Sequence, residues 1–368
     1  MTNPSPLQDC ISRYELSWEQ PETVGSRENA ATGQQTETLL CEFLPWGDCG
    51  CTVLATTGSV ELEYAAIRKS AGVFDAACRG SISLTGADSL SFAQRMTTQQ
   101  VSDLEIGASK LAFVVDRKGR IIADVLVVHQ ESRVLIDCDV TVVASLLEHF
   151  EKYIVADDVV VENVTQSEHR LWVLGPQAVA LGDGCFSLPV GLLGIGGIAM
   201  TVHLDSAEHV WMELVSKGVR PIGWYALNMV RVEEHIPMFR IDYDTSNLPH
   251  ETSSCDSRVR FDKGCYLGQE VVARMESLGG PKQGLVCLEL QEDALPIAGT
   301  QIWDTTADQG GKAIGVVTSS ATSPMRGGDV AVIAMIKNHI QLEGSTVYPW
   351  IGSEQLNAVI RPLSPKDR

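Results

Sequence analysis

One stretch of the chain is Lys263-Gly264-Cys265-Tyr266-Leu267-Gly268-Gln269-Glu270, called the motif loop below. Its residue types are the hardest in the chain to explain by a purely structural role. Its two glycines, four positions apart, allow sharp turns and a close approach of the backbone to another molecule. Cys265 stands between them, and the ammonium of Lys263 two residues earlier favours thiolate over thiol. The apolar run 271–273 follows, so the motif loop is predicted to be a turn that leads into a regular element. A glycine-bracketed turn around a small buried cysteine is the alternative, because most unpaired cysteines are buried.

The length and composition indicate a protein of more than one domain. With 368 residues, the chain exceeds one ordinary core and is predicted to form two or three domains. Its ten cysteines are spread without a regular framework, which indicates reduced thiols and a cytoplasmic protein. The close pair Cys49 and Cys51 has neither a second pair nor a nearby histidine, so no metal site is predicted there.

Charge and hydropathy argue against several classes of partner. The formal net charge of −19 disfavours general binding to nucleic acid or to an anionic membrane. No export signal is predicted near the amino terminus, and the richest apolar run, 188–200, is too short to span a bilayer and is interrupted by glycines. Residues 258–282 include five basic and three acidic residues, so the local net charge around the motif loop is positive, opposite in sign to that of the whole chain. A solvated face of mixed charge would explain the same small excess.

The order of predicted elements indicates an α+β fold with antiparallel and mixed sheets. Residues 1–38 are polar, so we expect a leader there, either a surface loop or a mobile segment, with ordered structure beginning near Leu39. Helical periodicity predicts helices over 61–72, 88–98, 140–153, 207–217 and 224–234. β-rich runs predict strands over 81–84, 111–115, 121–128, 134–136, 159–164, 171–174 and 199–204. The irregular alternation favours α+β layers over a regular βαβ wind.

The character of the chain changes at Gly279-Gly280-Pro281, which predicts a domain boundary. Five short β-rich runs follow, at 284–290, 300–303, 313–318, 329–336 and 344–348. Such spacing is typical of a small all-β barrel. The chain is therefore predicted to consist of the leader, an α+β region of two lobes over 39–278 and a barrel over 282–365.

Further motifs occur in a consistent order around the motif loop. They are Ser70-Ala71-Gly72-Val73-Phe74-Asp75, Gly86-Ala87-Asp88, Thr97-Thr98, Arg231-Val232-Glu233-Glu234, Ile236-Pro237, Asn247-Leu248-Pro249-His250-Glu251 and Gly315-Val316-Val317-Thr318-Ser319. Together with the motif loop they resemble the YgfZ family, relatives of the glycine-cleavage T protein. The resemblance covers roughly residues 61–362. It implies a three-lobed ring around a tetrahydrofolate site, followed by a barrel, in agreement with the predicted element order.

The resemblance also implies a chemistry, from which this chain departs. T proteins transfer a one-carbon unit to tetrahydrofolate with a carboxylate in a Gly-Gly-x-x-Asp-Asp-type segment. The matching segment here is 119–124, where Ala123 stands at the first Asp position and only Asp124 remains. Successive strand residues face opposite sides, so Asp124 is not expected to replace its neighbour without a bulge or register change.

Other departures point the same way. The T-protein Ser-His-Met matches Ala77-Cys78-Arg79 here, and the expected pocket glutamate becomes Gly197. Conversely, Cys265 has no counterpart in the T protein. Carboxylates have been lost and a thiol has been gained, which indicates an exchange of chemistry on one scaffold.

The first of three functions left open is that of a folate-dependent factor supporting the assembly or repair of iron-sulfur clusters in client enzymes. The resemblance then makes Cys265 the reactive or iron-contacting thiolate and Lys263 its electrostatic activator. The other residues of the loop would shape it, namely Gly264, Tyr266, Gly268, Gln269 and Glu270. Because clusters usually need four ligands, one thiolate implies transient handling or sharing with an assembly partner.

The second function is that of a folate-dependent one-carbon transferase of T-protein type. Asp124 would be its carboxylate, Arg231 or Arg79 would meet the anionic glutamate tail, and Trp224 would lie beside the pocket. A strand-end carboxylate and a helix-surface ion pair are the structural alternatives for Asp124 and Arg231. The third function is that of a non-catalytic, folate-sensing scaffold whose barrel recruits a partner.

Overall fold

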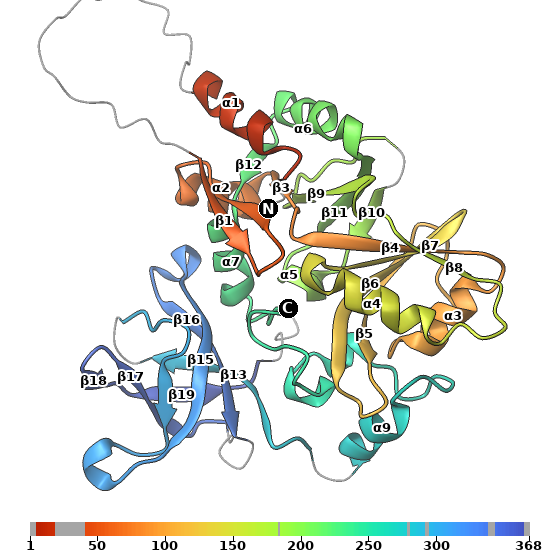
Figure 1. Cartoon of the computed structure of the whole chain (residues 1–368). Coiled ribbons are helices and arrows are strands. Elements are labelled where there is room, and N and C mark those ends of the chain that lie inside the picture. The colour runs from red at the N-terminus through yellow and green to blue at the C-terminus, as the bar shows by residue number, and fades with distance from the viewer. Residues whose placement is uncertain are drawn as a thin grey trace, which may run out of the picture.

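Two five-stranded sheets, a β-barrel and the helices that cover the sheets make up the protein in the computed structural model (Figure 1). The structure describes residues 5–18, 41–182, 185–277, 280–290, 294–337 and 343–363. Within these ranges, no helix is long and apolar enough to cross a membrane. An α+β region precedes a carboxy-terminal barrel, so the predicted fold class is confirmed.

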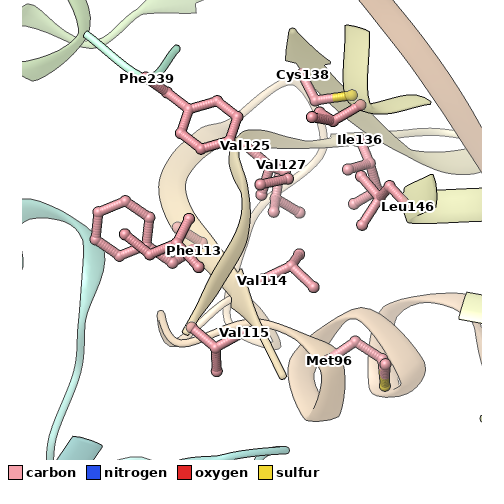
Figure 2. Close-up of a cluster of buried hydrophobic side chains, with 14 of the residues drawn as sticks. Met96, Phe113, Val114, Val115, Val125, Val127, Ile136, Cys138, Leu146 and Phe239 are labelled. Carbon is pink, nitrogen blue, oxygen red and sulfur yellow. The ribbon is translucent and has the colours of Figure 1, made fainter. Parts of the chain in front are cut away.

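The first sheet is antiparallel throughout and contains the predicted hairpin. In spatial order its strands are β5 (Ser109–Val115), β6 (Ile121–Gln130), β7 (Arg133–Asp139), β4 (Arg79–Thr85) and β8 (Val160–Asn163). The helices α3 (Ser89–Met96) and α4 (Val143–Glu151) pack against it, and Figure 2 shows part of the shared core. Met96, Val125, Val127, Ile136 and Leu146 are among its buried side chains.

The second sheet is buried on both faces by helices. In spatial order its strands are β10 (Cys185–Leu188), β11 (Gly197–His203), β9 (Glu168–Leu174), β3 (Gly72–Asp75) and β12 (Arg220–Ile222), and only β12 with β3 is a parallel pair. Because strand residues alternate, Val73 and Val173 pack with α6 (Ala207–Ser216), whereas Phe74 and Trp172 face α2 (Val60–Lys69) and α7 (Trp224–Glu233). The short helix α5 (Val190–Leu193) and the hairpin of β1 (Glu42–Trp46) and β2 (Cys51–Thr56) complete this part.

Residues 5–18 are ordered, contrary to the predicted polar leader. Helix α1 spans Gln8–Trp18, and Leu7, Cys10 and Ile11 are buried in one core with Trp211 of α6. Ser5 Oγ adds a hydrogen bond to the Asp75 carboxylate on β3. The prediction that order begins near Leu39 is therefore wrong for this segment, because three apolar residues at helical spacing suffice to dock a helix whose overall composition is polar. The rest of the predicted leader, from residue 19 onward, lies outside the described residues.

The barrel contains the five predicted strands and two more. Its strands are β13 (Gln283–Leu290), β14 (Gln301–Trp303), β15 (Ala313–Thr322), β16 (Val330–Lys337), β17 (Thr346–Ile351), β18 (Glu354–Gln355) and β19 (Ala358–Arg361). Pairing of β14 with β17 closes six of these strands into the barrel, and the seventh, β18, lies outside it and pairs with β17 alone. The predicted boundary at 279–281 falls partly outside the described residues.

Two buried carboxylates tie α7 and its following turn to the barrel. Glu233 accepts a hydrogen bond of 2.6 Å from Ser323 Oγ and pairs with Arg68 of α2 at 2.7 Å. Asp242 accepts from Thr318 Oγ1 and Ser319 Oγ, both at 2.6 Å, and from Arg231 at 2.7 Å. Charge-assisted bonds of this kind are stronger than neutral ones. The barrel is therefore held against α7 by polar contacts, and it lies beside α7 in Figure 1.

Candidate functional site

The motif loop lies against the end of α3 and the segment that follows it. It leads directly into helix α9 (Gln269–Ser277), as predicted. Lys263 is buried, and its Nζ atom donates hydrogen bonds of 2.6–2.7 Å to the carbonyl oxygens of Gln94, Thr97 and Gln99. The Leu267 amide donates to the Arg95 carbonyl at 3.1 Å. These bonds fasten the loop to residues 94–99 on both sides of Cys265.

We expected the Lys263 ammonium to favour the thiolate form of Cys265, but its hydrogen bonds are made elsewhere. An ammonium has three N–H groups, and all three are directed to carbonyl oxygens, so none is left for the thiol. Burial lowers the pKa of Lys263 to about 7, because the charged form loses its hydration. Its Nζ atom also lies 5.2 Å from the ring centre of Tyr266. Lys263 is therefore a clamp for the loop, and this replaces the predicted role as electrostatic activator.

Cys265 is exposed, whereas Lys263 and Tyr266 on either side of Gly264-Cys265 are buried. The Cys265 thiol is therefore exposed on a loop that is anchored by the buried side chains of Lys263 and Tyr266. Gln269 and Glu270 begin α9, and an acidic residue in the first turn stabilises a helix through its dipole. This arrangement contradicts the alternative of a small buried cysteine for Cys265.

The motif loop also packs against the turn between β5 and β6. Gly268 has φ +80°, and a Cβ atom on it would lie 2.4 Å from the Asp116 carbonyl oxygen. A Cβ atom on Gly119 in that turn would lie 3.0 Å from Val271. A Cβ atom on Gly264, in contrast, would have no neighbouring atom within 4 Å. Of the two glycines predicted to shape the loop, only Gly268 is required by a close approach.

The two residues at the T-protein carboxylate positions occupy different environments. Ala123 is buried in the core with Val125 and Val127. The side chain of Asp124 is directed instead to Arg258 and Tyr243. The two neighbouring side chains thus point in different directions, as strand alternation predicts, and the pairing of β5 with β6 has an irregularity just before Ala123.

The Asp124 carboxylate is buried and held by two partners. Arg258 Nε lies 2.9 Å from Oδ1 and 3.0 Å from Oδ2, and the Tyr243 hydroxyl donates to Oδ2 at 2.6 Å. Burial, with the neighbouring Asp124 charge, raises the pKa of Tyr243 well above its usual range, so the phenol remains a donor. The orientation of Asp124 is therefore determined by an ion pair and a hydrogen bond.

A continuous segment links this carboxylate to the motif loop. Arg258 ends α8 (Cys255–Arg258), and its carbonyl oxygen accepts from Thr98 Oγ1 at 2.6 Å. The amide of Arg260 then donates to the Thr98 carbonyl at 2.9 Å, and Lys263 binds the neighbouring carbonyl of Thr97. Residues 258–263 thus run along residues 97–99, with Asp124 at one end and Cys265 beyond the other.

Neither arginine predicted to meet an anionic tail has an available charge. Arg231 is 0% exposed and pairs with Asp242 at 2.7 Å. Arg79 is also buried, and its Nε donates to Asp137 at 2.7 Å. A buried charge already neutralised by a carboxylate is a poor site for a second anion. The predicted role of both residues at the tail is therefore corrected to that of internal ion pairs.

Trp224 lies half-buried at the start of α7, between Trp46 and Arg231. Its ring meets Trp46 edge to face, with ring centres 5.0 Å apart. The guanidinium carbon of Arg231 lies 5.8 Å from the Trp224 ring centre. Arg231 Nε is buried and has no hydrogen-bond partner within the described ranges. An unused donor therefore lies close to an aromatic surface.

The residues that hold the predicted ones in place do not stand out in the amino-acid sequence. Tyr243 and Asp242 stand next to each other, and they bind Asp124 and Arg231 respectively. In the sequence, Arg258 stands out only as part of a local basic excess. A signal was available in Asp242-Tyr243, which lies between two of the motifs quoted above, but the partner of Tyr243, Asp124, is 119 residues away in sequence.

Other parts of the described chain are less suited to a site. A groove of about 540 Å³ lies between the β6–β7 turn and the second sheet, and none of the predicted site residues lines it. Three or more His, Cys, Asp or Glu side chains arranged to hold a metal ion are not found in the residues that the structure describes.

Comparison with known proteins agrees with this fold. The chain matches the GCVT N-terminal domain over residues 18–187 and the glycine cleavage T-protein C-terminal barrel domain over residues 283–365. It is similar to the aminomethyltransferase of Bacillus subtilis (strain 168), with 26% identity over 318 residues, which cover 78% of this chain and 86% of that protein. An aminomethyltransferase of Halalkalibacterium halodurans is 24% identical over 331 residues, with coverage of 82% and 88%.

A solved structure has the same architecture. The glycine cleavage system aminomethyltransferase T from Bartonella henselae superposes with a TM-score of 0.78 at 18% sequence identity, covering 89% of this chain and 95% of that one. At this identity the likeness concerns the fold. It confirms the expected arrangement of mixed helices and sheets followed by a small β-barrel, which is closed, antiparallel and six-stranded.

Proposed function

This chain belongs to the superfamily of the glycine-cleavage T protein, and we propose accordingly that it binds a reduced folate and handles a one-carbon unit on it. The oriented carboxylate of Asp124 is the observation that carries this proposal. The comparisons support it through relatives named aminomethyltransferase that match most of the chain.

The residues present fit tetrahydrofolate. Arg231 Nε offers an unpartnered buried N–H beside the Trp224 ring, and a pterin presents ring acceptors and a flat face. Each carboxylate oxygen accepts two hydrogen bonds, so Oδ1 of Asp124 can accept one in addition to that from Arg258. The turn that carries Asp242 and Tyr243 binds both Arg231 and Asp124, and so sets their relative positions.

Tetrahydrofolate, when bound, supplies the amine that carries the one-carbon unit. Asp124 would accept a hydrogen bond from a reacting amine through Oδ1, while Arg258 and Tyr243 keep its carboxylate in one orientation. Such positioning favours reaction because less orientational freedom remains to be lost in the transition state.

Binding and turnover by the purified protein test this proposal. We expect calorimetry to detect tetrahydrofolate binding, and we expect transfer of a one-carbon unit from an aminomethyl or methyl donor to tetrahydrofolate. Binding without turnover of any such donor would contradict the transferase function and favour a folate-sensing scaffold. Absence of binding would contradict the folate-dependent function as a whole.

The exposed thiol favours a second candidate function, support of iron-sulfur clusters in client enzymes. Cys265 stands on a loop fastened by Lys263 and Leu267, and the motif loop resembles the signature of the YgfZ family. In this function the cluster is cargo, and other ligands come from a client or assembly protein, because a single thiolate cannot hold it. Folate binding in the ring is compatible with this function.

Replacing Cys265 with alanine is expected to abolish the support of cluster-dependent enzymes without affecting the fold. The side chain is exposed, so the free energy of unfolding should change by less than about 0.5 kcal/mol. The measurement is the activity of iron-sulfur enzymes in a deletion strain complemented with each variant. Cys49→Ala, which removes another exposed thiol, is the matched control and should complement fully. Full complementation by Cys265→Ala would eliminate this second function.

A further inference from the structure

The carboxy-terminal barrel contains a group of buried polar side-chain atoms that have no partner. They are Nε1 of Trp303, Oγ1 of Thr306 and Nε2 of Gln355, and none of them has a hydrogen-bond partner within the described ranges. Such atoms cost free energy and are rare in native proteins. We propose that they form, with the ring of Trp350, a binding site for a proline-containing peptide segment of a partner protein. This site is separate from the folate-dependent function and does not depend on it.

Strand pairing brings these side chains together from separate segments. Trp303 ends β14, which pairs with β17, and Trp350 of β17 stands opposite Gln355 of β18. The ring centres of Trp303 and Trp350 are 6.3 Å apart. Thr306 precedes the short 3₁₀ turn Ala307–Gln309, whose first amide donates to Gln355 Oε1 at 2.7 Å. The four side chains therefore belong to one cluster, called the barrel cluster below.

The unpartnered groups of the barrel cluster are hydrogen-bond donors. The indole N–H of Trp303 can only donate, and the hydroxyl of Thr306 can donate as well. Since Oε1 of Gln355 already accepts from the Ala307 amide, the end of its side chain without a partner is the NH₂ group. A ligand that fits must therefore supply acceptors. A proline residue does so, because it has an acceptor carbonyl and no N–H that would need an acceptor in return.

The aromatic ring and the charges beside the barrel cluster agree with such a peptide. Trp350 is 40% exposed and offers a flat apolar surface. Proline-rich segments pack against aromatic side chains in a conformation that is formed before binding. The exposed charged residues next to the cluster are two acids, Asp308 and Glu354, and one base, Lys312. A net negative charge disfavours an anionic ligand and favours a peptide with a basic residue beside its prolines.

The strand that covers the barrel cluster is weakly held. β18 is only two residues long and pairs with β17 alone. Its displacement breaks few hydrogen bonds, and it would separate Gln355 from Trp350 and open the buried donors to a ligand. Figure 1 shows β17 and β18 on the side of the barrel that is turned away from the two sheets, where a partner can approach.

The test is calorimetric titration of the full-length protein with a capped peptide of three Ala-Pro-Pro repeats that ends in arginine. We expect this peptide to bind, and a peptide with alanine in place of every proline to bind at least about tenfold more weakly. Trp350→Ala should weaken binding of the proline peptide about tenfold, because the apolar surface is lost. Phe261→Ala removes another aromatic side chain that is 40% exposed, and as the control it should leave binding unchanged.

A second pair of variants tests the buried donors. Thr306→Val removes the hydroxyl at nearly constant volume and should weaken binding about fivefold. It should not lower the melting temperature, because the hydroxyl has no partner in the described part of the protein. Thr306→Ser keeps the hydroxyl and should retain the affinity.

Three outcomes would overturn the proposal. Unchanged affinity of Thr306→Val would show that the buried donors do not contact the peptide. Equal affinity for the proline and alanine peptides would exclude recognition of proline. Absence of binding by the unsubstituted protein would exclude the site as a whole, whereas tetrahydrofolate binding, measured separately, decides the folate-dependent function.

Discussion

Replacing Asp124 with alanine is expected to lower the free energy of unfolding by about 3–5 kcal/mol and to abolish one-carbon transfer. The substitution leaves the buried guanidinium of Arg258 without its carboxylate and the Tyr243 hydroxyl without its acceptor. An uncompensated buried charge is costlier than the loss of a contact, because the charge has neither water nor a counter-ion. Urea-induced unfolding and the transfer assay measure the two effects.

A second substitution shows whether the cost comes from the unpaired charge. In Asp124→Ala with Arg258→Met, the buried charge is gone and an apolar chain of similar length takes its place. This double variant should be more stable than Asp124→Ala alone, while transfer activity remains absent. A loss of under about 1 kcal/mol for Asp124→Ala would show that the pair is hydrated in solution and would remove the basis for an oriented carboxylate.

Replacing Gly268 with alanine is expected to destabilise the protein by about 3 kcal/mol and to detach the motif loop from the hairpin turn. The left-handed conformation disfavours a Cβ atom, and that atom would lie 2.4 Å from the Asp116 carbonyl oxygen, a contact that only a backbone shift can relieve. The measurements are chemical unfolding and the rate of Cys265 alkylation, which should rise as the loop loses its fixed position.

Gly264 provides the matched control in the same loop. A Cβ atom there would meet nothing within 4 Å, so Gly264→Ala should change the free energy of unfolding by less than about 0.5 kcal/mol. If both variants lost the same free energy of unfolding, the contact between Gly268 and Asp116 could not be the cause. The proposed fixed position of Cys265 would then be contradicted.

The features of the site that were predicted correctly are those determined by residues close together in sequence. The hairpin of β5 and β6 follows from two β-rich runs around a glycine-containing turn, and the structure has it in that place. The opposite directions of Ala123 and Asp124 follow from the two-residue period of a strand. The start of α9 after Gly268 follows in the same way from the turn that precedes an apolar run.

The partners of charged side chains were predicted less well than the helices and strands. Arg79 and Arg231 were expected at the ligand, yet Asp137, 58 residues from Arg79, and Asp242 neutralise them inside the protein. Lys263 was expected to act on a residue two positions away, and its partners lie some 164–169 residues earlier in the chain. For Lys263, proximity in sequence suggested a partner, and a distant segment supplied the real ones. For the two arginines, the resemblance suggested a ligand, and carboxylates inside the protein pair with them instead.

Patterns in the amino-acid sequence were enough to predict the α+β region, the barrel, the motif loop with its thiol and the exchange of a carboxylate for Ala123. These features depend either on patterns among residues close together in sequence or on motifs that resemble those of a known family. The folded chain was needed to show that Lys263 is a clamp, that Arg79 and Arg231 form internal ion pairs and that Asp124 is held by Arg258 and Tyr243. A charge is available to a ligand only if folding leaves it without a buried partner, and such partners come from segments that meet only in the folded chain.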